Sequence, residues 1–223
     1  MNPQGVILDI DGTLVDSNDA HALAWVRAFE EAGHTASFAK VRRLIGMGGD
    51  KLMPEAIGLE EGSDRGKQIA RRRKEIFQAE YLPGLKPLPG ARDLLFRMHD
   101  DGLRLSVATS ASRGDAQALL KVLGAGDLID EKTSKDDAES SKPDPDIVVA
   151  AMRKLGLPPE SLIMLGDTPY DIEAASRAGI RTVAFRSGGW KDEDLQGAIE
   201  IYDGPEDLLL RYESSPFAPK RAA

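Results

Sequence analysis

Residues 6–13 read Val-Ile-Leu-Asp-Ile-Asp-Gly-Thr, a short apolar run that ends in two aspartates and a turn. A continuous run of aliphatic residues bounded by turn residues is typical of a strand that is buried on both faces of a parallel sheet. Asp9 and Asp11 would then lie where this strand ends. Ligands bind beyond the carboxyl ends of the strands in an open parallel sheet. The opening stretch therefore predicts both a fold class and the place of a site.

The chain after residue 85 alternates between strand and helix patterns. Strands are expected at residues 103–108, near Thr133, and at 162–165, 182–185 and 199–202. Helices are expected between them at 91–101, 115–123, 145–155, 170–178 and 205–211. This alternation is typical of a parallel sheet with helices on both faces, so we predict an α/β fold with a Rossmann-like core. The last residues, 214–223, are expected to fray.

Residues 17–84 interrupt this pattern and contain no strand-like run. Helices are expected at 19–32, 40–45 and 64–81, with a break at residues 46–49, Gly-Met-Gly-Gly. The segment holds 11 basic and 10 acidic residues of the chain's 29 and 37, so its net charge is +1 against −9 for the rest. We expect two domains: a core of residues 1–16 and 85–223, and an inserted all-helical domain of residues 17–84.

The composition excludes several classes of protein. With 223 residues, the chain has the length of one to two domains at ~150 residues each. The absence of cysteine excludes disulfides and thiolate metal sites, and 3 histidines are too few for a histidine-rich metal centre. The net charge of −8 argues against nucleic acid as a partner. No run approaches the ~18 apolar residues of a membrane span, and the N-terminus lacks a signal peptide, so a cytoplasmic location is expected.

Polar side chains follow the predicted strands at the points where they end. Thr109 and Ser110 follow the strand of residues 103–108, and Asp167 follows that of residues 162–165, with Asp171 shortly after. Lys142 precedes a predicted helix in the run Ser-Ser-Lys-Pro-Asp-Pro. Because the carboxyl ends of parallel strands meet at one edge of the sheet, we expect these side chains to lie close to Asp9 and Asp11.

Such a cluster points to phosphate chemistry. Crowded carboxylates repel unless a cation neutralises them, and oxygen ligands without thiolate or imidazole favour Mg²⁺. A lysine, a hydroxyl and backbone N–H groups would hold a dianion beside the metal. A carboxylate also serves as the nucleophile of phosphoryl transfer through an aspartyl phosphate.

Four motifs in order resemble those of the haloacid dehalogenase-like hydrolase superfamily. They are DIDGTLVDS at residues 9–17, ATS at 108–110, KPDP at 142–145 and GDTPYD at 166–171. The resemblance covers residues 5–210. It is greatest to the phosphoglycolate phosphatase-like and β-phosphoglucomutase-like members, which carry a helical cap inserted just after the first motif. The resemblance thus implies that residues 17–84 form a cap.

The resemblance also implies roles for individual residues. Asp9 would be the nucleophile and a Mg²⁺ ligand. Asp11 would protonate the leaving oxygen and then activate water, and its backbone carbonyl would bind the metal. Asp167 would be the third protein ligand of the metal, and Asp171 would act behind it or through water. Each has a structural alternative: Asp-Gly pairs are common in plain turns, and Asp171 suits the start of a helix.

The phosphate-binding residues leave one choice open. Ser110 would bind the phosphoryl group, but Thr109 is its rival because the motif can be shifted by one residue. Ser110 would otherwise cap the next helix. Lys142 would neutralise charge on both Asp9 and the phosphate; the alternative is an exposed lysine before a turn.

The helical segment offers three candidate substrate contacts. His21 occupies a position where related caps often carry a histidine that faces the entrance of the site, although a lone histidine is more often structural. The loop of residues 46–49 would close over the substrate, with Arg43 or Lys51 reaching an anionic group. Trp25 is expected in the core. Residues 71–74, Arg-Arg-Arg-Lys, cannot share one helix face, and we expect them to be solvated.

The sequence therefore predicts a Mg²⁺-dependent phosphatase that acts on a small phosphorylated metabolite through an aspartyl phosphate. The main alternative is a sugar phosphomutase of the β-phosphoglucomutase type. Two residues argue against it: the mutase relatives tend to carry an aliphatic residue at the position of Thr13 and a glutamate at that of Gly166. A second alternative is a phosphoacceptor or binding protein without catalysis, which would hold phosphate and not release it repeatedly.

Overall fold

The computed structural model describes residues 3–219. Six parallel strands form one sheet in the order β3-β2-β1-β4-β5-β6. They span β1 Gly5–Leu8, β2 Arg104–Ala108, β3 Glu131–Thr133, β4 Leu162–Gly166, β5 Arg181–Phe185 and β6 Ala198–Tyr202. The predicted α/β fold with a Rossmann-like core is confirmed. The strand order reverses between β1 and β4, which is where an open sheet of this kind leaves a crevice for ligands.

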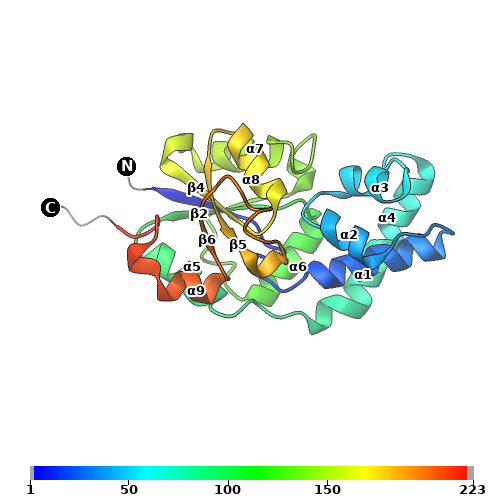
Figure 1. Ribbon diagram of the computed structural model, residues 1–223, viewed down its shortest axis with the longest axis horizontal. Helices are drawn as coiled ribbons and strands as arrows, with labels where there is room; N and C mark the ends of the chain where they lie inside the picture. Colours follow the sequence, from blue (N-terminus) through cyan, green and yellow to red (C-terminus); the bar gives the residue numbers. More distant parts are fainter. Residues whose placement is uncertain (1–2, 220–223) are drawn as a thin grey trace.

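Helices cover both faces of the sheet (Figure 1). They span α5 Ala91–Asp100, α6 Arg113–Leu123, α7 Asp146–Leu155, α8 Pro169–Arg177 and α9 Pro205–Leu210. Val6 and Leu8 of β1 belong to the apolar cluster that includes α5, α6 and α9, whereas Ile7 packs in the cluster of α7 and α8. Successive side chains of a strand point to opposite faces, so an unbroken apolar run is needed to fill both clusters.

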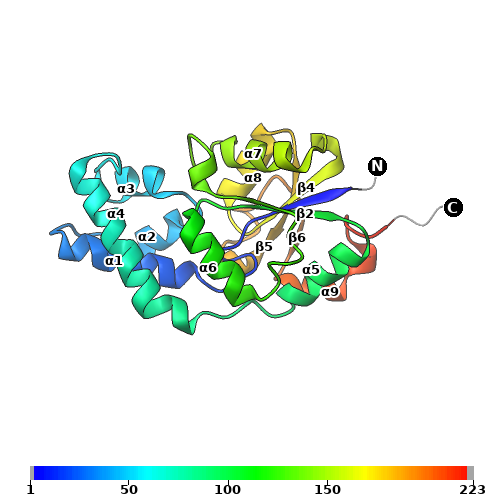
Figure 2. The same cartoon turned by 180° about the vertical axis from the view of Figure 1, so that it is seen from behind.

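Four helices lie apart from the sheet, beyond the carboxyl ends of the strands (Figures 1 and 2). They span α1 Asn18–Glu31, α2 Phe38–Leu44, α3 Gly49–Ile57 and α4 Asp64–Ile76, and a π-helical turn at Phe77–Tyr81 extends α4. α1 packs against α2, α4 and the π-helical turn, and α2 packs against α3. The position of this helical segment places it over the edge of the sheet at which β1 and β4 end.

Helix α3 was not expected from the sequence. Glycines at its start and Pro54 in its interior are both unfavourable in a helix. The helix nevertheless begins at Gly49 and ends at Gly58, whose backbone is left-handed. Leu52, Met53 and Ala56 are buried on one side of it, so tertiary packing outweighs the local preferences.

The prediction of a frayed C-terminus is wrong for residues 214–217. Ser215 is buried, and Phe217, 2% exposed, joins the main apolar cluster together with Tyr212. Aromatic residues near the end of a chain gain enough from burial to hold it against the core. Residues 220–223 lie outside the described part of the chain.

The described helices include none that is both long and apolar enough to cross a membrane.

Replacing Phe217 by alanine is expected to lower the free energy of unfolding by about 3–5 kcal/mol, because it leaves a cavity in the core. Urea denaturation of the two proteins measures the difference. Phe96→Ala is the matched control, since Phe96 is 62% exposed and its loss should change stability little. Equal effects of the two substitutions would contradict the burial of the C-terminal segment.

Candidate active site

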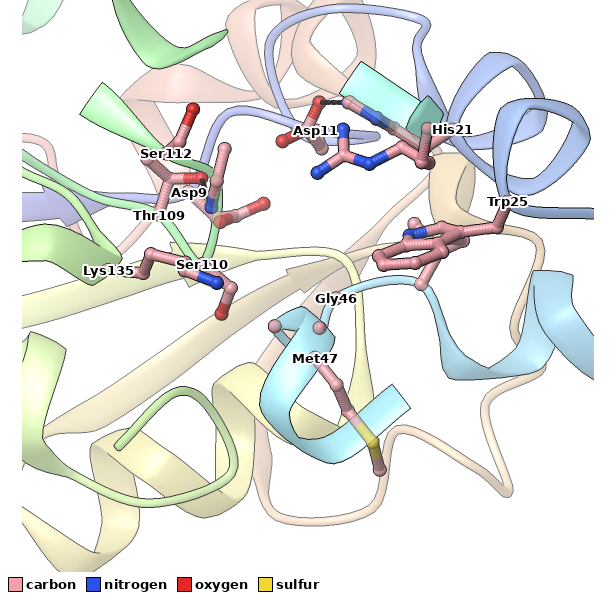
Figure 3. Close-up of a pocket in the computed structure, with 15 residues that line it drawn as sticks. Asp9, Asp11, His21, Trp25, Gly46, Met47, Thr109, Ser110, Ser112 and Lys135 are labelled. Atoms are coloured by element: carbon pink, nitrogen blue, oxygen red, sulfur yellow. Dashed lines mark hydrogen bonds and ion pairs between the residues drawn. The ribbon is translucent and has the colours of Figure 1, made fainter. Parts of the chain in front are cut away.

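A cavity lies between the carboxyl ends of the strands and the helical segment (Figure 3). Residues from both parts of the chain line it: Asp9, Asp11, His21, Trp25, Ile45, Gly46, Met47, Gly48, Gly49, Arg73, Thr109, Ser110, Ala111, Ser112 and Lys135. The sequence-predicted residues Asp9, Asp11, Thr109, Ser110 and His21 are thus brought together. Lys142, Asp167 and Asp171 do not line the cavity but are buried next to Asp9. Arg43 and Lys51 were also expected near the substrate and lie elsewhere.

Lys142 lies beneath Asp9 and joins it to Asp171. Its ammonium Nζ is 2.6 Å from Asp9 Oδ1 and 2.7 Å from Asp171 Oδ1, and all three side chains are buried. Burial raises the pKa of Asp9 well above its usual value, the charge of Lys142 opposes this, and nearby carboxylates add to it. Burial would lower the pKa of Lys142, but the two carboxylates outweigh it and raise that pKa. The ammonium therefore remains charged inside the protein.

Asp11 is held by the first turn of α1. Ser17 Oγ donates a hydrogen bond to Asp11 Oδ1 at 2.5 Å, and His21 Nε2 lies 2.8 Å from the same oxygen. The imidazole stacks on the ring of Phe77 with centroids 4.0 Å apart, so its position is fixed. Burial opposes ionisation of Asp11, but the electrostatic interaction with His21 and the hydrogen bonds from His21 and Ser17 outweigh it and lower the pKa of Asp11.

Asp167 follows β4 and is completely buried. Thr13 Oγ1 donates to its Oδ1 at 2.7 Å, and Asn18 Nδ2 donates to its Oδ2 at 2.9 Å. Burial and the neighbouring Asp171 raise the pKa of Asp167 to about 7, in spite of these two donors. A side chain at Gly12 would approach Asp167 Oδ2 to 2.2 Å, so the turn after β1 passes directly over this carboxylate.

Asp171 serves both the site and the start of α8. Its Oδ2 accepts hydrogen bonds from the backbone N–H groups of Asp167 and Thr168 and from the hydroxyl of Thr168, while its Oδ1 receives Lys142. Both oxygens are thus engaged by protein donors. The role that the sequence predicts for Asp171, behind the metal ligands, stays a prediction.

The residues fit a divalent cation. Oxygen atoms of Asp9, Asp167 and Asp171 lie within 4.8 Å of one another, and the ammonium of Lys142 contacts two of these carboxylates. The amide oxygen of Asn18 is buried beside them with no hydrogen-bond partner in the described chain. A purely oxygen donor set with excess negative charge favours Mg²⁺ over softer metals.

The hydroxyl groups after β2 differ in their availability. Thr109 Oγ1 already accepts a hydrogen bond from the backbone N–H of Ala111 at 3.0 Å. Ser110 Oγ is buried at the cavity and has no hydrogen-bond partner among the residues that the structure describes. The geometry therefore favours Ser110 over Thr109 as the hydroxyl that meets a ligand.

Two residues expected near the substrate point elsewhere. Arg43 lies over the ring of Trp190 and 3.5 Å from Asp194, and Lys51 pairs with Asp144 at 2.8 Å. Neither lines the cavity. Both instead connect the helical segment to the core.

Arg73 was expected to be solvated, yet it lines the cavity with its side chain 15% exposed. Its guanidinium lies 5.0 Å from the ring centre of Trp25 and 3.3 Å from Asp115, and its Nε is buried without a partner in the described residues. The spacing of apolar residues on this helix already indicates that Arg73 faces inward. Ile69 and Ile76, four residues before and three after, are buried on the same face of α4.

Trp25 is buried as expected, at 4% exposure, but it also forms a wall of the cavity. Lys135 is a further lining residue that was not expected from the sequence, and it forms an ion pair with Glu61 at 3.0 Å. It lies outside the four motifs, and no pattern in the sequence marked it.

The chain is similar in sequence and in structure to known hydrolases. Residues 6–185 match the family described as haloacid dehalogenase-like hydrolase. A phosphoglycolate phosphatase from Rhodospirillum rubrum is 33% identical over 211 residues, covering 90% of this chain and 87% of its own. A crystal structure of a hydrolase from Pseudomonas syringae has a TM-score of 0.88 and 29% identity, covering 95% of this chain and 98% of its own. CbbY from Rhodobacter sphaeroides in complex with xylulose-1,5-bisphosphate has a TM-score of 0.79 and 26% identity, covering 92% and 96%.

The affinity for Mg²⁺ is expected to fall as the pH is lowered through about 7. Below that pH, Asp167 holds a proton because burial raises its pKa to about 7, and the metal binds only the ionised carboxylate, so the proton must be released. Calorimetric titration with MgCl₂ between pH 6 and pH 8 measures this dependence. Asp167→Asn is the control and should bind weakly at every pH. An affinity that is constant over this range would contradict the assignment of Asp167 as a ligand.

Proposed function

Since this chain belongs to the haloacid dehalogenase-like hydrolase family and is a phosphatase, we propose that it hydrolyses a small phosphomonoester through a phosphoryl group carried on Asp9. The observation that carries the proposal is the position of Asp9. Its carboxylate lies at the cavity, 2.6 Å from the buried ammonium of Lys142. The hydroxyl of Ser110, which has no hydrogen-bond partner among residues 3–219, lines the same cavity. The proposed nucleophile and a hydroxyl able to donate a hydrogen bond to phosphate thus line one cavity, and the positive charge of Lys142 lies directly behind the nucleophile.

Asp9, Asp167 and the backbone carbonyl of Asp11 are the proposed ligands of Mg²⁺. The metal would supply positive charge to the phosphoryl oxygens. Lys142 opposes the rise in the pKa of Asp9 that burial causes, so it favours the ionised, nucleophilic form, and its ammonium holds the carboxylate at the cavity. Ser110 Oγ would donate a hydrogen bond to a phosphoryl oxygen.

In the first step, an oxygen of Asp9 forms a bond to phosphorus while the bond from phosphorus to the leaving oxygen breaks. Asp11 gives its proton to that oxygen. The low pKa of Asp11 refers to the state without substrate; a phosphate dianion beside it favours the protonated carboxyl. In the second step, ionised Asp11 takes a proton from water, whose oxygen attacks phosphorus and breaks its bond to Asp9.

We propose that the helical segment of residues 17–84 acts as a cap, as the sequence analysis anticipates. Support comes from its position over the cavity and from the residues it contributes, among them His21, Trp25 and Arg73. A cavity walled on one side by the cap admits a small molecule and excludes bulk water during phosphoryl transfer.

The position of Arg73 at the cavity favours a substrate that carries a second anionic group. Its buried Nε lacks a partner in the described residues, and its bond to Asp115 is long at 3.3 Å, so the guanidinium has donors to spare at the cavity. Two similar proteins are named for, or bound to, molecules with two anionic groups, phosphoglycolate and xylulose-1,5-bisphosphate. A carboxylate or second phosphate is the group that a guanidinium recognises best.

A sugar phosphomutase remains the alternative, and two observations favour the phosphatase. A Cβ at Gly166 would lie 2.5 Å from Cγ of Asp171, so the glutamate found there in mutase relatives would displace Asp171. Thr13 uses its hydroxyl to hold Asp167, which an aliphatic residue would not do. A phosphoacceptor without catalysis would differ from a phosphatase in that it would not release phosphate repeatedly.

The proposed function is tested by release of phosphate from a panel of small phosphomonoesters with and without Mg²⁺. We expect repeated turnover that requires the metal, and loss of activity by about 10³-fold or more in Asp9→Asn. Acid quenching with radiolabelled substrate should leave label on the peptide that contains Asp9. Conversion of a hexose 1-phosphate to the 6-phosphate without hydrolysis would establish the mutase instead, and full activity of Asp9→Asn would overturn the nucleophile.

Arg73→Ala is expected to raise the KM for a substrate with a second anionic group by about 10- to 100-fold, because a hydrogen bond to a charged group is lost. The KM for p-nitrophenyl phosphate, which has no such group, should change little. Arg71→Ala on the same helix is the matched control, since its side chain is 84% exposed. Equal changes for both substrates would show that Arg73 has only a structural role.

A further inference from the structure

Lys142 lies in a short loop of the core, residues 141–144, which we call the lysine loop. Both residues that flank Lys142 and Pro143 in this loop contact the cap. Ser141 is buried, and its Oγ donates a hydrogen bond to Asp50 Oδ1 at 2.6 Å while its backbone N–H donates to Asp50 Oδ2 at 3.3 Å. Asp144 pairs with Lys51 at 2.8 Å. The first turn of α3 thus holds the lysine loop at both ends.

The backbone of the cap reaches the lysine loop at Gly48. Its N–H donates to Ser141 Oγ at 3.0 Å. A Cβ at this position would lie 2.6 Å from Cβ of Ser141 and 2.5 Å from Asp50 Oδ1. The φ of Gly48 is −76°, which any residue adopts. Gly48 is therefore required for its lack of a side chain, that is, for the close approach of the cap to Ser141.

The two ends of the contact differ in strength. Lys51 and Asp144 are 37% and 31% exposed, and Asp144 also pairs with Arg177 of the core at 2.9 Å, so this pair contributes little. By contrast, the carboxylate of Asp50 accepts two hydrogen bonds from the buried residue Ser141, and these bonds hold the loop in one geometry. Asp50 is therefore the principal residue through which the cap acts on the lysine loop.

We propose that Asp50 is a positioning residue. When the cap closes, its hydrogen bonds with Ser141 hold the lysine loop in the conformation that keeps Lys142 between Asp9 and Asp171. The inference rests on the proposed function, in which Lys142 neutralises charge during phosphoryl transfer. A displacement of about 1 Å at a catalytic group costs on the order of 10²-fold in rate. The cap thereby makes full charge neutralisation depend on a closed site.

The test compares Asp50→Ala with the wild-type chain in hydrolysis of p-nitrophenyl phosphate with Mg²⁺. We expect kcat to fall by about 10-fold or more with little change in KM, because Lys142 acts in the transition state. Asp50→Asn keeps an acceptor for the Ser141 hydroxyl and should restore part of the rate. Ser141→Ala should lower kcat to a similar extent, and the double variant should be no worse than either single variant.

A second readout does not depend on activity. Reductive methylation with formaldehyde, followed by mass spectrometry, reports how accessible the Lys142 amine is. It should be several-fold faster in Asp50→Ala than in the wild type. Glu61→Gln is the matched control, because it takes the negative charge out of another contact between cap and core, the ion pair with Lys135, in which no residue of the lysine loop takes part.

The outcomes separate the inference from the function on which it rests. An unchanged kcat and unchanged methylation of Lys142 in Asp50→Ala would overturn the positioning role, as would additive effects of Asp50→Ala and Ser141→Ala. If Glu61→Gln accelerated the methylation of Lys142 as much as Asp50→Ala does, Asp50 would contribute only to the general docking of the cap. That result would also overturn the positioning role. Absence of phosphatase activity in the wild type would refute the proposed function, whereas methylation would still decide whether Asp50 holds the lysine loop.

Discussion

An ammonium group buried among carboxylates is the interaction on which the rest of the site depends. Lys142 Nζ lies within 2.7 Å of both Asp9 and Asp171, and all three side chains are hidden from solvent. Ionised carboxylates at such distances repel one another unless a cation lies between them. Because Asp9 follows β1 and Asp171 lies in the first turn of α8, the same ammonium also joins two elements at the point where the strand order reverses.

The helical segment is connected to the acidic residues through the first turn of α1. Ser17 and His21 contact Asp11, and Asn18 contacts Asp167. On the opposite side, Asp50 contacts the loop that carries Lys142. A movement of these helices therefore changes the surroundings of several carboxylates at once. Through these contacts the proposed cap would influence the reaction although it carries none of the proposed nucleophile, acid or metal ligands.

The sequence predicts most of the core, because buried parallel strands and their carboxyl ends leave strong local patterns. Asp9, Asp11, Lys142 and Asp167 are brought together as expected. Patterns in the helical segment are less informative: helix α3 forms against its local preferences, and Arg73 lies in a run of four basic residues, of which only the spacing to Ile69 and Ile76 marks it as facing inward. Arg43 and Lys51 have the charge for a substrate contact, but their partners are Asp194 and Asp144. Such pairings depend on how two parts of the chain dock, which local sequence does not encode.

The ammonium of Lys142 stabilises the buried carboxylates in the folded protein, and the variant Lys142→Met shows how strongly the fold depends on it. Urea denaturation of this variant and of the wild type, at pH 5 and pH 8 without divalent cations, measures the free energy of unfolding. Without the ammonium, the pKa of Asp9 rises further, so stability is retained at pH 5, where the carboxyl is protonated, and lost as the pH rises. We expect Lys142→Met to lower the free energy of unfolding by about 3–5 kcal/mol at pH 8 and by much less at pH 5. Equal losses at the two pH values, or none, would contradict this expectation.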